Sequence, residues 1–532
     1  MKNWYSRITA VGFLILFLPI LFCLFAFGNN MDYFDVVKQN TLVHNFFLLP
    51  ICILGLLIVG FLKKPLNKIE VTGSRPRNLI VALCIALFYL GTYVINIKIA
   101  KCIAFYSGWD MSIVTGAVYQ LSEGKDIADN VLNYYKIFPN NAPITYVLYK
   151  LFQFAKEKEG YPYNIEFIWI QASCLMVSLA GFFTTMTARK ITKKMTPTLV
   201  SMLIFTALIS LSPWKVIPYT DILSVAFGIF ILYFYACYRE IESPLRYLLW
   251  LAICFFGLAG GVFKATAYVP LIAILATEAV RILMTPGWRE KLKGLLVIGV
   301  LLGVSVAGVF AWRGHAYEVI GYEPDASRAV TWHHYLRMGL NEYSTGGYNS
   351  EYYQIINEYI DRPVSERHAE EIRQVREALR ERGLIGTIYF YLRKSVMNYN
   401  DGSFSWYMEG NFHFQEYQDI SQSSFKPLLR EIYWYDGKEY RLYLTCSQLA
   451  WLFTLLLLPG TAVWLLCKKG EEEGTDGAAA ILMTLIGATL FVMLFEGRAR
   501  YLLNLAPIYV AAASISFDLV AAGWRKQRPK QR

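Results

Sequence analysis

Charged residues are scarce in this chain. Asp, Glu, Lys and Arg make up 17% of its 532 residues, whereas hydrophobic residues make up 55%. A water-soluble protein of this length carries more charge and seldom contains so many uninterrupted apolar segments. The sequence also lacks the glycine-rich fingerprints of P-loop and Rossmann nucleotide-binding proteins. These absences argue against a soluble, nucleotide-dependent enzyme.

Cysteine and histidine are few and show no metal-ligand spacing. The nine cysteines are scattered singly without a CxxC pair, so we interpret them as apolar packing residues. The six histidines form no metal-binding set in the sequence, so we expect no cofactor and do not favour a divalent metal ion. His333, in the segment TWHHYLRMGLN, is interpreted as a contact to a bound donor or acceptor substrate in preference to a metal ligand.

Long apolar segments dominate what is present. Runs of about 18 to 23 apolar residues are long enough to span a bilayer as helices. The first run is too long for the core of a signal peptide, and we interpret it as a retained span. The pattern predicts an all-α polytopic membrane protein with about twelve transmembrane helices. They lie near residues 8–28, 44–62, 79–99, 164–187, 198–212, 217–238, 247–263, 265–284, 294–312, 446–467, 477–495 and 501–522.

The net charge of +11 reflects membrane topology. Basic residues gather in alternate connections, as the positive-inside rule predicts for cytoplasmic loops. The basic clusters occur near residues 2–7, 63–77, 189–194, 281–293 and 525–532. We therefore expect a multi-pass cell-membrane protein with both termini in the cytoplasm, and no nucleic-acid partner.

This topology places two large segments outside the cell and predicts three regions. Residues 1–312 form a transmembrane module that includes the first outer loop, 100–163; residues 313–445 form a small mixed extracytoplasmic domain; residues 446–532 carry the last helices and a basic tail.

The sequence predicts several elements within the two outer segments. In the first loop, apolar spacing predicts an interfacial helix from Asp110 to Leu121, and Pro143 opens a second helix that ends near Phe154. In the second segment, Pro363 opens a polar helix ending at Gly383, and the aromatic residues at 433–435 predict a short hairpin.

Ionisable side chains cluster at the outer ends of the predicted spans. Asp110 follows Trp109 in the first loop, although a carboxylate there is also what a helix cap requires. Asp221, after Tyr219, begins the sixth span, and Lys264 lies between two apolar helices. Ionisable groups are costly in such places and are usually functional.

A short polar motif, EGRARY, precedes the last span. It contains Glu496, Arg498 and Arg500. A guanidinium group is a bidentate donor suited to phosphate, although arginines at a helix end also snorkel to the interface. Together with Asp110, this inventory offers one prominent carboxylate and several cations.

That inventory limits the chemistry. Hydrolysis of an ordinary glycoside usually needs two carboxylates, because the leaving alkoxide must be protonated. Phosphate is already a good leaving group and is stabilised by cations, so a single carboxylate suffices as the base toward an acceptor hydroxyl. The residues therefore fit sugar transfer from a polyprenyl-phosphate donor.

The chain resembles the GT-C superfamily of membrane glycosyltransferases, nearest the protein O-mannosyltransferase and lipid A aminoarabinose transferase branch. The resemblance covers about residues 1–310 and 446–522. It is carried by Asp110 with the helix to Leu121, by Gly124-Lys125-Asp126, by the stretch Pro139 to Pro143, by PYTDILSVAFGIFILYF, by Gly257-Leu258-Ala259 with Lys264, and by RARYLLNLAPIYV. Many relatives have Asp-Glu in the first loop, whereas Met111 follows Asp110 here.

The resemblance implies a function and a role for each candidate. We expect an inverting glycosyltransferase whose general base is Asp110 and whose donor phosphate is bound by Lys264, Arg498 and Arg500. The acceptor is a cell-envelope glycan, lipid or protein hydroxyl on the extracytoplasmic side. Supporting or substrate-binding roles fall to Asp221, Trp109, Tyr219, Glu496 and His333. The alternative is a transporter or flippase of lipid-linked sugars, which would favour polar sites at mid-membrane.

Overall fold

Membrane-length helices make up most of the protein. The computed structural model describes residues 4–27, 43–68, 75–409, 413–417, 420–468 and 474–519. Within these ranges, eleven helical segments are long and apolar enough to cross a bilayer. They are α1 Trp4–Ala26, α2 Asn45–Lys68, α3 Arg75–Ile103, α7 Phe167–Thr192, α9 Thr220–Leu223 with α10 Phe227–Tyr238, α11 Leu245–Phe263, η3 Ala265–Ala267 with α12 Tyr268–Leu283, α13 Trp288–Val319, α19 Tyr440–Cys467, α20 Thr475–Leu494, and η6 Ala499–Leu505 with α21 Ala506–Ile515 and η7 Ser516–Asp518.

The fifth predicted span is a shorter apolar helix. It consists of α8 Met195–Phe205 and the π-helical turn η1 Thr206–Ser210. Counted with the eleven longer segments, it accounts for every predicted apolar run. The prediction of an all-α polytopic membrane protein is confirmed.

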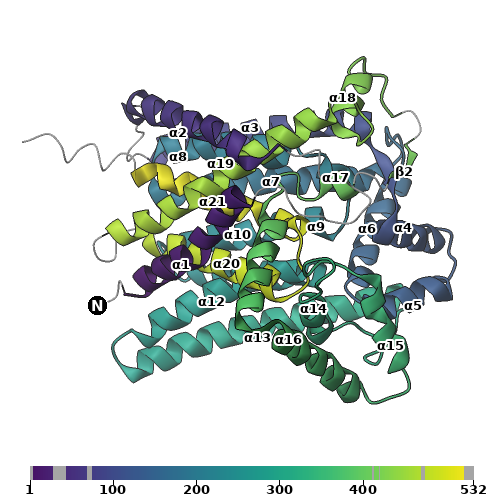
Figure 1. Ribbon diagram of the computed structural model, residues 1–532. Coiled ribbons are helices and arrows are strands. Elements are labelled where there is room, and N and C mark those ends of the chain that lie inside the picture. The colour runs from purple at the N-terminus through teal and green to yellow at the C-terminus, as the bar shows by residue number, and fades with distance from the viewer. Residues whose placement is uncertain are drawn as a thin grey trace, which may run out of the picture.

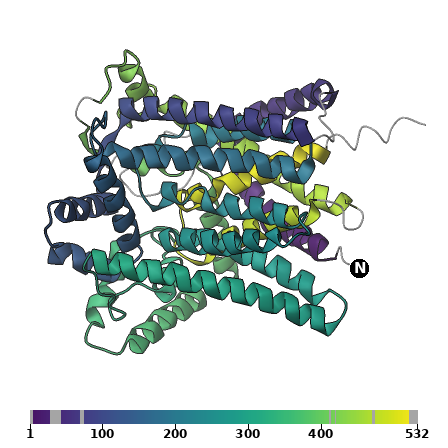
Figure 2. The ribbon, with the colours of Figure 1, turned by 180° about the vertical axis from the view of Figure 1, so that it is seen from behind.

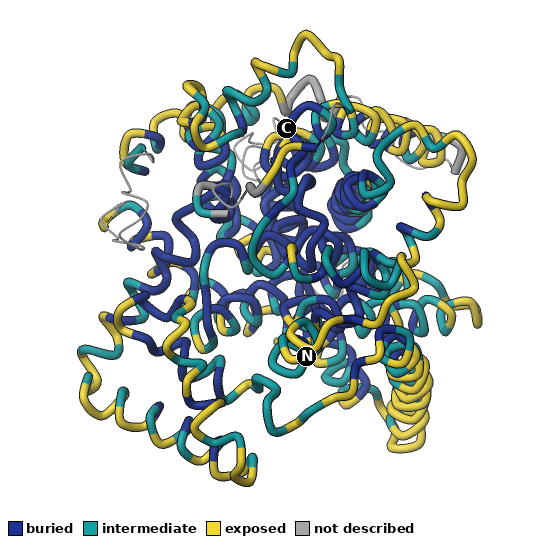
Figure 3. Tube along the Cα trace, turned by 90° about the vertical axis from the view of Figure 1, so that its right-hand side faces the viewer, coloured by how far each residue is buried: buried dark blue, intermediate teal, exposed yellow. Residues whose placement is uncertain are grey.

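The burial pattern separates a central core from a lipid-facing periphery. In the apolar 18-residue window of the last span, Ala499–Asp518, 94% of the residues are buried, whereas in that of Trp288–Val319 only 11% are buried. Buried segments occupy the middle of the bundle and exposed ones its rim (Figure 3). Because the exposed residues of α2 and α13 are large and apolar, as with Phe61 and Val300, their surroundings must be hydrocarbon.

The elements between the spans gather at one end of the bundle, here called the loop end. Figure 1 places the N-terminus and the α12–α13 connection at the opposite end. Seen from behind, the dark-blue helices of the first loop lie across the ends of the long helices (Figure 2). The loop end contains α4 Trp109–Ser122, α5 Asp129–Ile137, α6 Asn141–Glu157, α14 Trp332–Met338, η4 Ser350–Tyr353 and α15 Gln354–Glu358.

The first loop contains the two predicted helices. The helix expected from Asp110 to Leu121 is α4. The helix expected from Pro143 begins two residues earlier, at Asn141, and continues to Glu157. Proline is tolerated in the first turn of α6, because the amide hydrogens there have no partner within the helix.

The second segment bends back into the bundle. Its longest helical element, α16 Val364–Tyr399, consists of two helices that meet at a kink at Gly383, where glycine adopts φ 61°, so the first helix ends at Gly383 as predicted. The half after the kink packs against α1 and α20 and carries the buried residues Lys394 to Tyr399.

The rest of this segment contains shorter helices joined by irregular stretches. It includes α17 Trp406–Glu409 and α18 Lys426–Tyr433. The hairpin predicted at 433–435 is wrong: Leu428, Leu429 and Ile432 have helical spacing, and α18 ends at Tyr433. Strand β2 His413–Glu416 instead pairs antiparallel with β1 Phe105–Ser107 of the first loop, so a small ladder ties the two segments together.

A buried amide cluster fixes the turn after α16. The Gln448 amide donates to Asn45 Oδ1 at 2.8 Å and to Asn400 Oδ1 at 3.1 Å. Its oxygen accepts a hydrogen bond from the Gly402 backbone at 2.7 Å. One side chain therefore joins α2, α19 and the 400–402 turn.

Replacing Gln448 with leucine should destabilise the protein. The substitution removes three buried hydrogen bonds. Asn400 Oδ1 still accepts from the Asn45 amide. Asn45 Oδ1 and the Gly402 backbone N–H, however, lose their Gln448 partner, and each such unsatisfied group costs about 1–3 kcal/mol. We expect the midpoint of thermal unfolding in detergent to fall by several degrees. Gln153→Leu on the partly exposed surface of α6 is the control, and an equal effect of both substitutions would contradict this role.

Candidate functional site

Asp110 occupies the first turn of α4, at the point where the first loop leaves β1. It is half-buried and therefore accessible from the loop end. The preceding residue, Trp109, has a left-handed backbone with φ 44°, a conformation that costs a bulky residue about 1–3 kcal/mol. This turn directs the Trp109 ring 4.2 Å from the Arg500 guanidinium and edge-on to Tyr219 at 5.0 Å.

Two tyrosines and an asparagine surround the Asp110 carboxylate. The Tyr219 hydroxyl lies 3.2 Å from Asp110 Oδ2 and 2.6 Å from Asn141 Oδ1, so its single proton is shared between two acceptors. The Asn141 amide donates to the Tyr134 hydroxyl at 2.7 Å. Burial raises the pKa of Tyr134, and the charges of Tyr219 and Asp110 raise it further. Tyr134 therefore stays a neutral hydroxyl beside Asp110.

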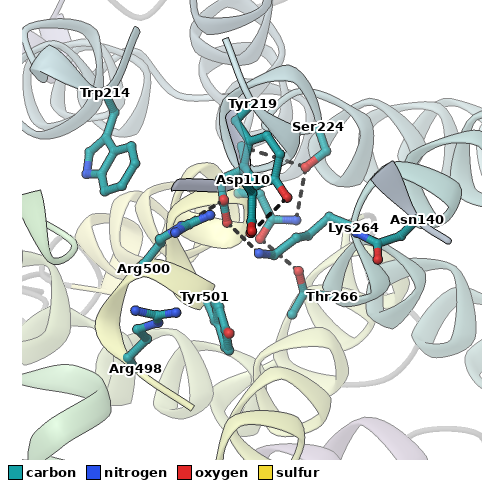
Figure 4. Close-up of polar contacts among 12 residues, drawn as sticks. Asp110, Asn140, Trp214, Tyr219, Ser224, Lys264, Thr266, Arg498, Arg500 and Tyr501 are labelled. Atoms are coloured by element: carbon teal, nitrogen blue, oxygen red, sulfur yellow. Dashed lines mark hydrogen bonds and ion pairs between the residues drawn. The ribbon is translucent and has the colours of Figure 1, made fainter. Parts of the chain in front are cut away.

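Asp221 is the centre of the charged part of the site. Its carboxylate is almost fully buried and accepts from Lys264 Nζ at 2.8 Å and from Arg500 Nε at 2.9 Å. The charged ends of Lys264 and Arg500 point toward each other within the site (Figure 4). A buried carboxylate shared by two cations is held far more firmly than an exposed ion pair, because removing one partner strands a charge.

Three interrupted helices bring these residues together. Asp221 lies in α9, a single turn separated from α10 by residues 224–226. Lys264 has an extended backbone between α11 and η3, and Arg500 lies in the 3-10 turn η6. Hydrogen bonds linking Thr266, Asn504 and Ser224 join the same three breaks.

Arg498 and Glu496 form a second, neighbouring group. Arg498 Nη2 lies 3.8 Å from Glu496 Oε1, and the Tyr501 hydroxyl donates to the same oxygen at 2.5 Å. Lys264 Nζ lies 4.5 Å from the centre of the Tyr501 ring. Tyr501 therefore stands between the Glu496 group and the Asp221 group.

A pocket of about 380 Å³ opens beside these groups. Lys264, Glu496 and Tyr501 line it, together with Asn140 from the first loop and Trp332 from α14. Its size falls within the range of small-molecule sites, which are concave, mostly apolar, and carry a few polar groups. Burial raises the pKa of Tyr335, which also lines the pocket, and the charges of Glu496 and Asp110 add to that shift.

The structure brings most of the predicted residues together. Lys264 and Glu496 line the pocket, and Asp110, Trp109, Tyr219, Asp221 and Arg500 form the network beside it. Arg498 belongs to the Glu496 group. His333 does not line the pocket: its ring stacks on Trp332 at 3.7 Å and on His368 at 4.0 Å.

Sequence reasoning missed the residues that complete the network. Asn141 and Tyr134 hold Tyr219, and Trp332 and Tyr335 line the pocket from α14. The only signal for Asn141 and Tyr134 is the unusual polar and aromatic content of residues 134–143. No spacing rule connects that stretch with α14, because the two lie nearly 200 residues apart in the sequence.

The fold and the site define a polytopic integral membrane protein with a charged pocket at one end of its helix bundle. The chain belongs to a family described as conserved hypothetical integral membrane protein, which matches residues 1–521. A comparison with curated proteins finds no match.

Removing the Asp221 carboxylate should weaken the whole site. Asp221→Asn leaves Lys264 and Arg500 without their shared anion, and breaking such a buried pair costs about 3–5 kcal/mol. We expect a lower midpoint of thermal unfolding in detergent. Adding Lys264→Met to Asp221→Asn should recover part of that loss, because one stranded charge disappears. Strictly additive effects of the two substitutions would contradict the pairing.

Lys394 should make stability depend on pH. Its ammonium group donates to the carbonyls of Gly339 at 2.7 Å and Phe495 at 2.6 Å, next to Glu496. Burial lowers the pKa of Lys394 to about 7. Between about pH 7 and its usual value of 10.5, the unfolded chain binds a proton that the folded chain does not, so stability rises with pH. Thermal unfolding of Lys394→Gln across this range should show a smaller rise than the parent; equal slopes would contradict the assignment.

Proposed function

We propose that the protein is a membrane glycosyltransferase that moves a sugar from a polyprenyl-phosphate donor to an acceptor hydroxyl. The observation that carries this proposal is the juxtaposition of Asp110, a half-buried carboxylate, with the Lys264–Asp221–Arg500 cluster at the ends of interrupted spans. The resemblance of the sequence to GT-C transferases agrees with it.

Asp110 acts as the general base in this proposal. Its carboxylate takes the proton of the acceptor hydroxyl as the acceptor oxygen attacks the anomeric carbon of the sugar. The bond between that carbon and the phosphate oxygen breaks, and the bonding electrons leave with the polyprenyl phosphate. The attack from the opposite face inverts the anomeric centre. Tyr219 orients Asp110 through its hydroxyl, and Asn141 fixes Tyr219.

Lys264 is the cation best placed to meet the donor phosphate, because it lines the pocket. An ammonium group has three donors, and Asp221 occupies one of them at 2.8 Å, so Lys264 can bind a phosphate oxygen without leaving Asp221. Arg500 does not line the pocket; its guanidinium lies 4.2 Å from the centre of the Trp109 ring. It acts as a positioning residue that holds Asp221. Glu496 accepts a hydrogen bond from Tyr501 and lies next to Arg498. Together they position Tyr501, which lines the pocket.

The location of the site suits a lipid-linked donor. The loop end carries the first loop and α14, opposite the N-terminus (Figure 1). With basic connections on the cytoplasmic side, this end faces outward. The donor then enters from the outer leaflet, and a cell-envelope glycan, lipid or protein supplies the acceptor hydroxyl.

The main alternative is a transporter or flippase of lipid-linked sugars. Interrupted helices are also found in transporters, where the breaks lie near the bilayer midplane. Here Asp221 lies at the start of the span Thr220–Tyr238, and Lys264 lies between two consecutive spans. A site at the ends of spans favours chemistry at the interface over passage through the membrane.

The proposal is tested by measuring phosphate release. Purified protein in liposomes is given a panel of short-chain polyprenyl phosphates carrying radiolabelled hexoses or pentoses, with a membrane extract as acceptor. We expect transfer of label and release of polyprenyl phosphate. Asp110→Asn should lower the rate by about 10²- to 10⁴-fold, the usual contribution of a general base.

The control variant is Asp129→Asn, an exposed carboxylate of the same loop, which should keep the parent rate. Full transfer by Asp110→Asn would refute the role of Asp110. Movement of intact donor across the bilayer without release of polyprenyl phosphate would instead identify a transporter.

A further inference from the structure

A cluster of metal-ligand side chains lies where α14 meets α16. His333 comes from α14, and His368 and Glu371 come from consecutive turns of α16. One nitrogen of each imidazole and one oxygen of the carboxylate all lie within 4.8 Å of one another. The sequence gives little sign of this set, because 34 residues separate His333 from His368.

Glu371 is a buried carboxylate with one oxygen that makes no hydrogen bond among the described residues. Its side chain is 1% exposed. One oxygen, Oε1, lies 3.2 Å from His334 Nδ1, whereas Oε2 is buried and has no hydrogen-bond partner among the described residues. Burying a carboxylate oxygen without a partner is costly, and buried charges are normally paired or bound to a metal.

The two histidines are held beside Glu371. The Thr331 hydroxyl lies 3.1 Å from His333 Nδ1 and 3.2 Å from His368 Nε2, so it bridges the two rings. The rings are stacked, with planes 18° apart. Donors around a tetrahedral zinc ion lie roughly 3.3 Å apart at bond lengths of about 2.0–2.2 Å, so the rings must turn out of their stack to bind.

We propose that His333, His368 and Glu371 bind one divalent transition-metal ion of the kind that prefers imidazole, with Zn²⁺ as the best fit. Two imidazoles and one carboxylate are the donor set of many zinc sites that keep a fourth position for water. Hydrogen bonds from groups behind the ligands orient them, and His334 is placed to hold Glu371 in this way.

The ion would stabilise the wall of the pocket. Thr331 and Trp332 line the pocket, and His333 follows them directly. Binding would fasten this wall to α16 at a point behind the pocket. The site does not depend on the proposed transferase function, because none of its three ligands contacts the Asp110 network in the described contacts.

The test uses the full-length protein in detergent. After removal of metals with a chelator and dialysis against Zn²⁺, we expect about one zinc per chain by elemental analysis. Substitutions His333→Ala, His368→Ala and Glu371→Gln should each weaken Zn²⁺ binding by roughly 100-fold or more, since even loss of an orienting group costs 10- to 100-fold. Two matched controls, Glu370→Gln on the same helix and His315→Asn on α13, should bind as the parent does.

A further variant separates loss of a ligand from loss of folding. His368→Cys should still bind the metal, and its Co²⁺ form should show a thiolate-to-cobalt charge-transfer band that the parent protein lacks. Failure of the parent to bind Zn²⁺ would overturn the proposal. So would unchanged binding in all three ligand variants, or a Co²⁺ spectrum of His368→Cys identical to that of the parent.

Discussion

The bridge from Asp221 to Lys264 and Arg500 is the interaction on which the loop end depends. Each of these residues lies at an interruption of a membrane helix, where backbone groups lose their regular partners. The ion pairs at 2.8 Å and 2.9 Å hold the three interruptions together. The Asp221 carboxylate at one break neutralises the cations at the other two breaks. Lys264 therefore faces a pocket instead of lipid.

The first loop packs against these ion pairs through aromatic contacts of Trp109. Trp109 adopts a left-handed backbone, and its ring lies against Arg500 and Tyr219. Strained conformations of this kind persist only where the surroundings determine them, and they gather at functional sites. Because Asp110 follows directly, the packing of Trp109 sets the direction of the carboxylate. The positioning of the proposed base is thus coupled to Arg500, which holds Asp221, the ion-pair partner of the proposed phosphate ligand Lys264.

The second large segment closes the pocket from the other side. Its helix α16 kinks at Gly383, so that the half before the kink carries His368 and Glu371 and the half after it enters the bundle. Helix α14 packs against α16 and contributes Trp332 and Tyr335 to the pocket wall. The β1–β2 ladder ties the first loop to the same segment. A substrate in the pocket would therefore touch two segments whose positions depend on each other.

Hydrophobicity and charge placement in the sequence by themselves determined the architecture. Apolar run lengths identified the spans, since a helix must satisfy its own backbone in lipid. The cost of ionisable groups near spans singled out Asp110, Asp221, Lys264 and Arg500 as candidates. Local patterns also predicted α4 and the helix end at Gly383, although they misread Tyr433–Tyr435 as a hairpin.

Only the tertiary structure decided which candidates meet. The pairing of Asp221 with Arg500, 279 residues later, and the place of Asn141 beside Tyr219 depend on how helices pack. The same holds for His333 with His368 and Glu371, which come from two helices. The physical reason is that local sequence encodes the periodicity of one segment, whereas contacts between distant segments arise from the packing of the whole bundle.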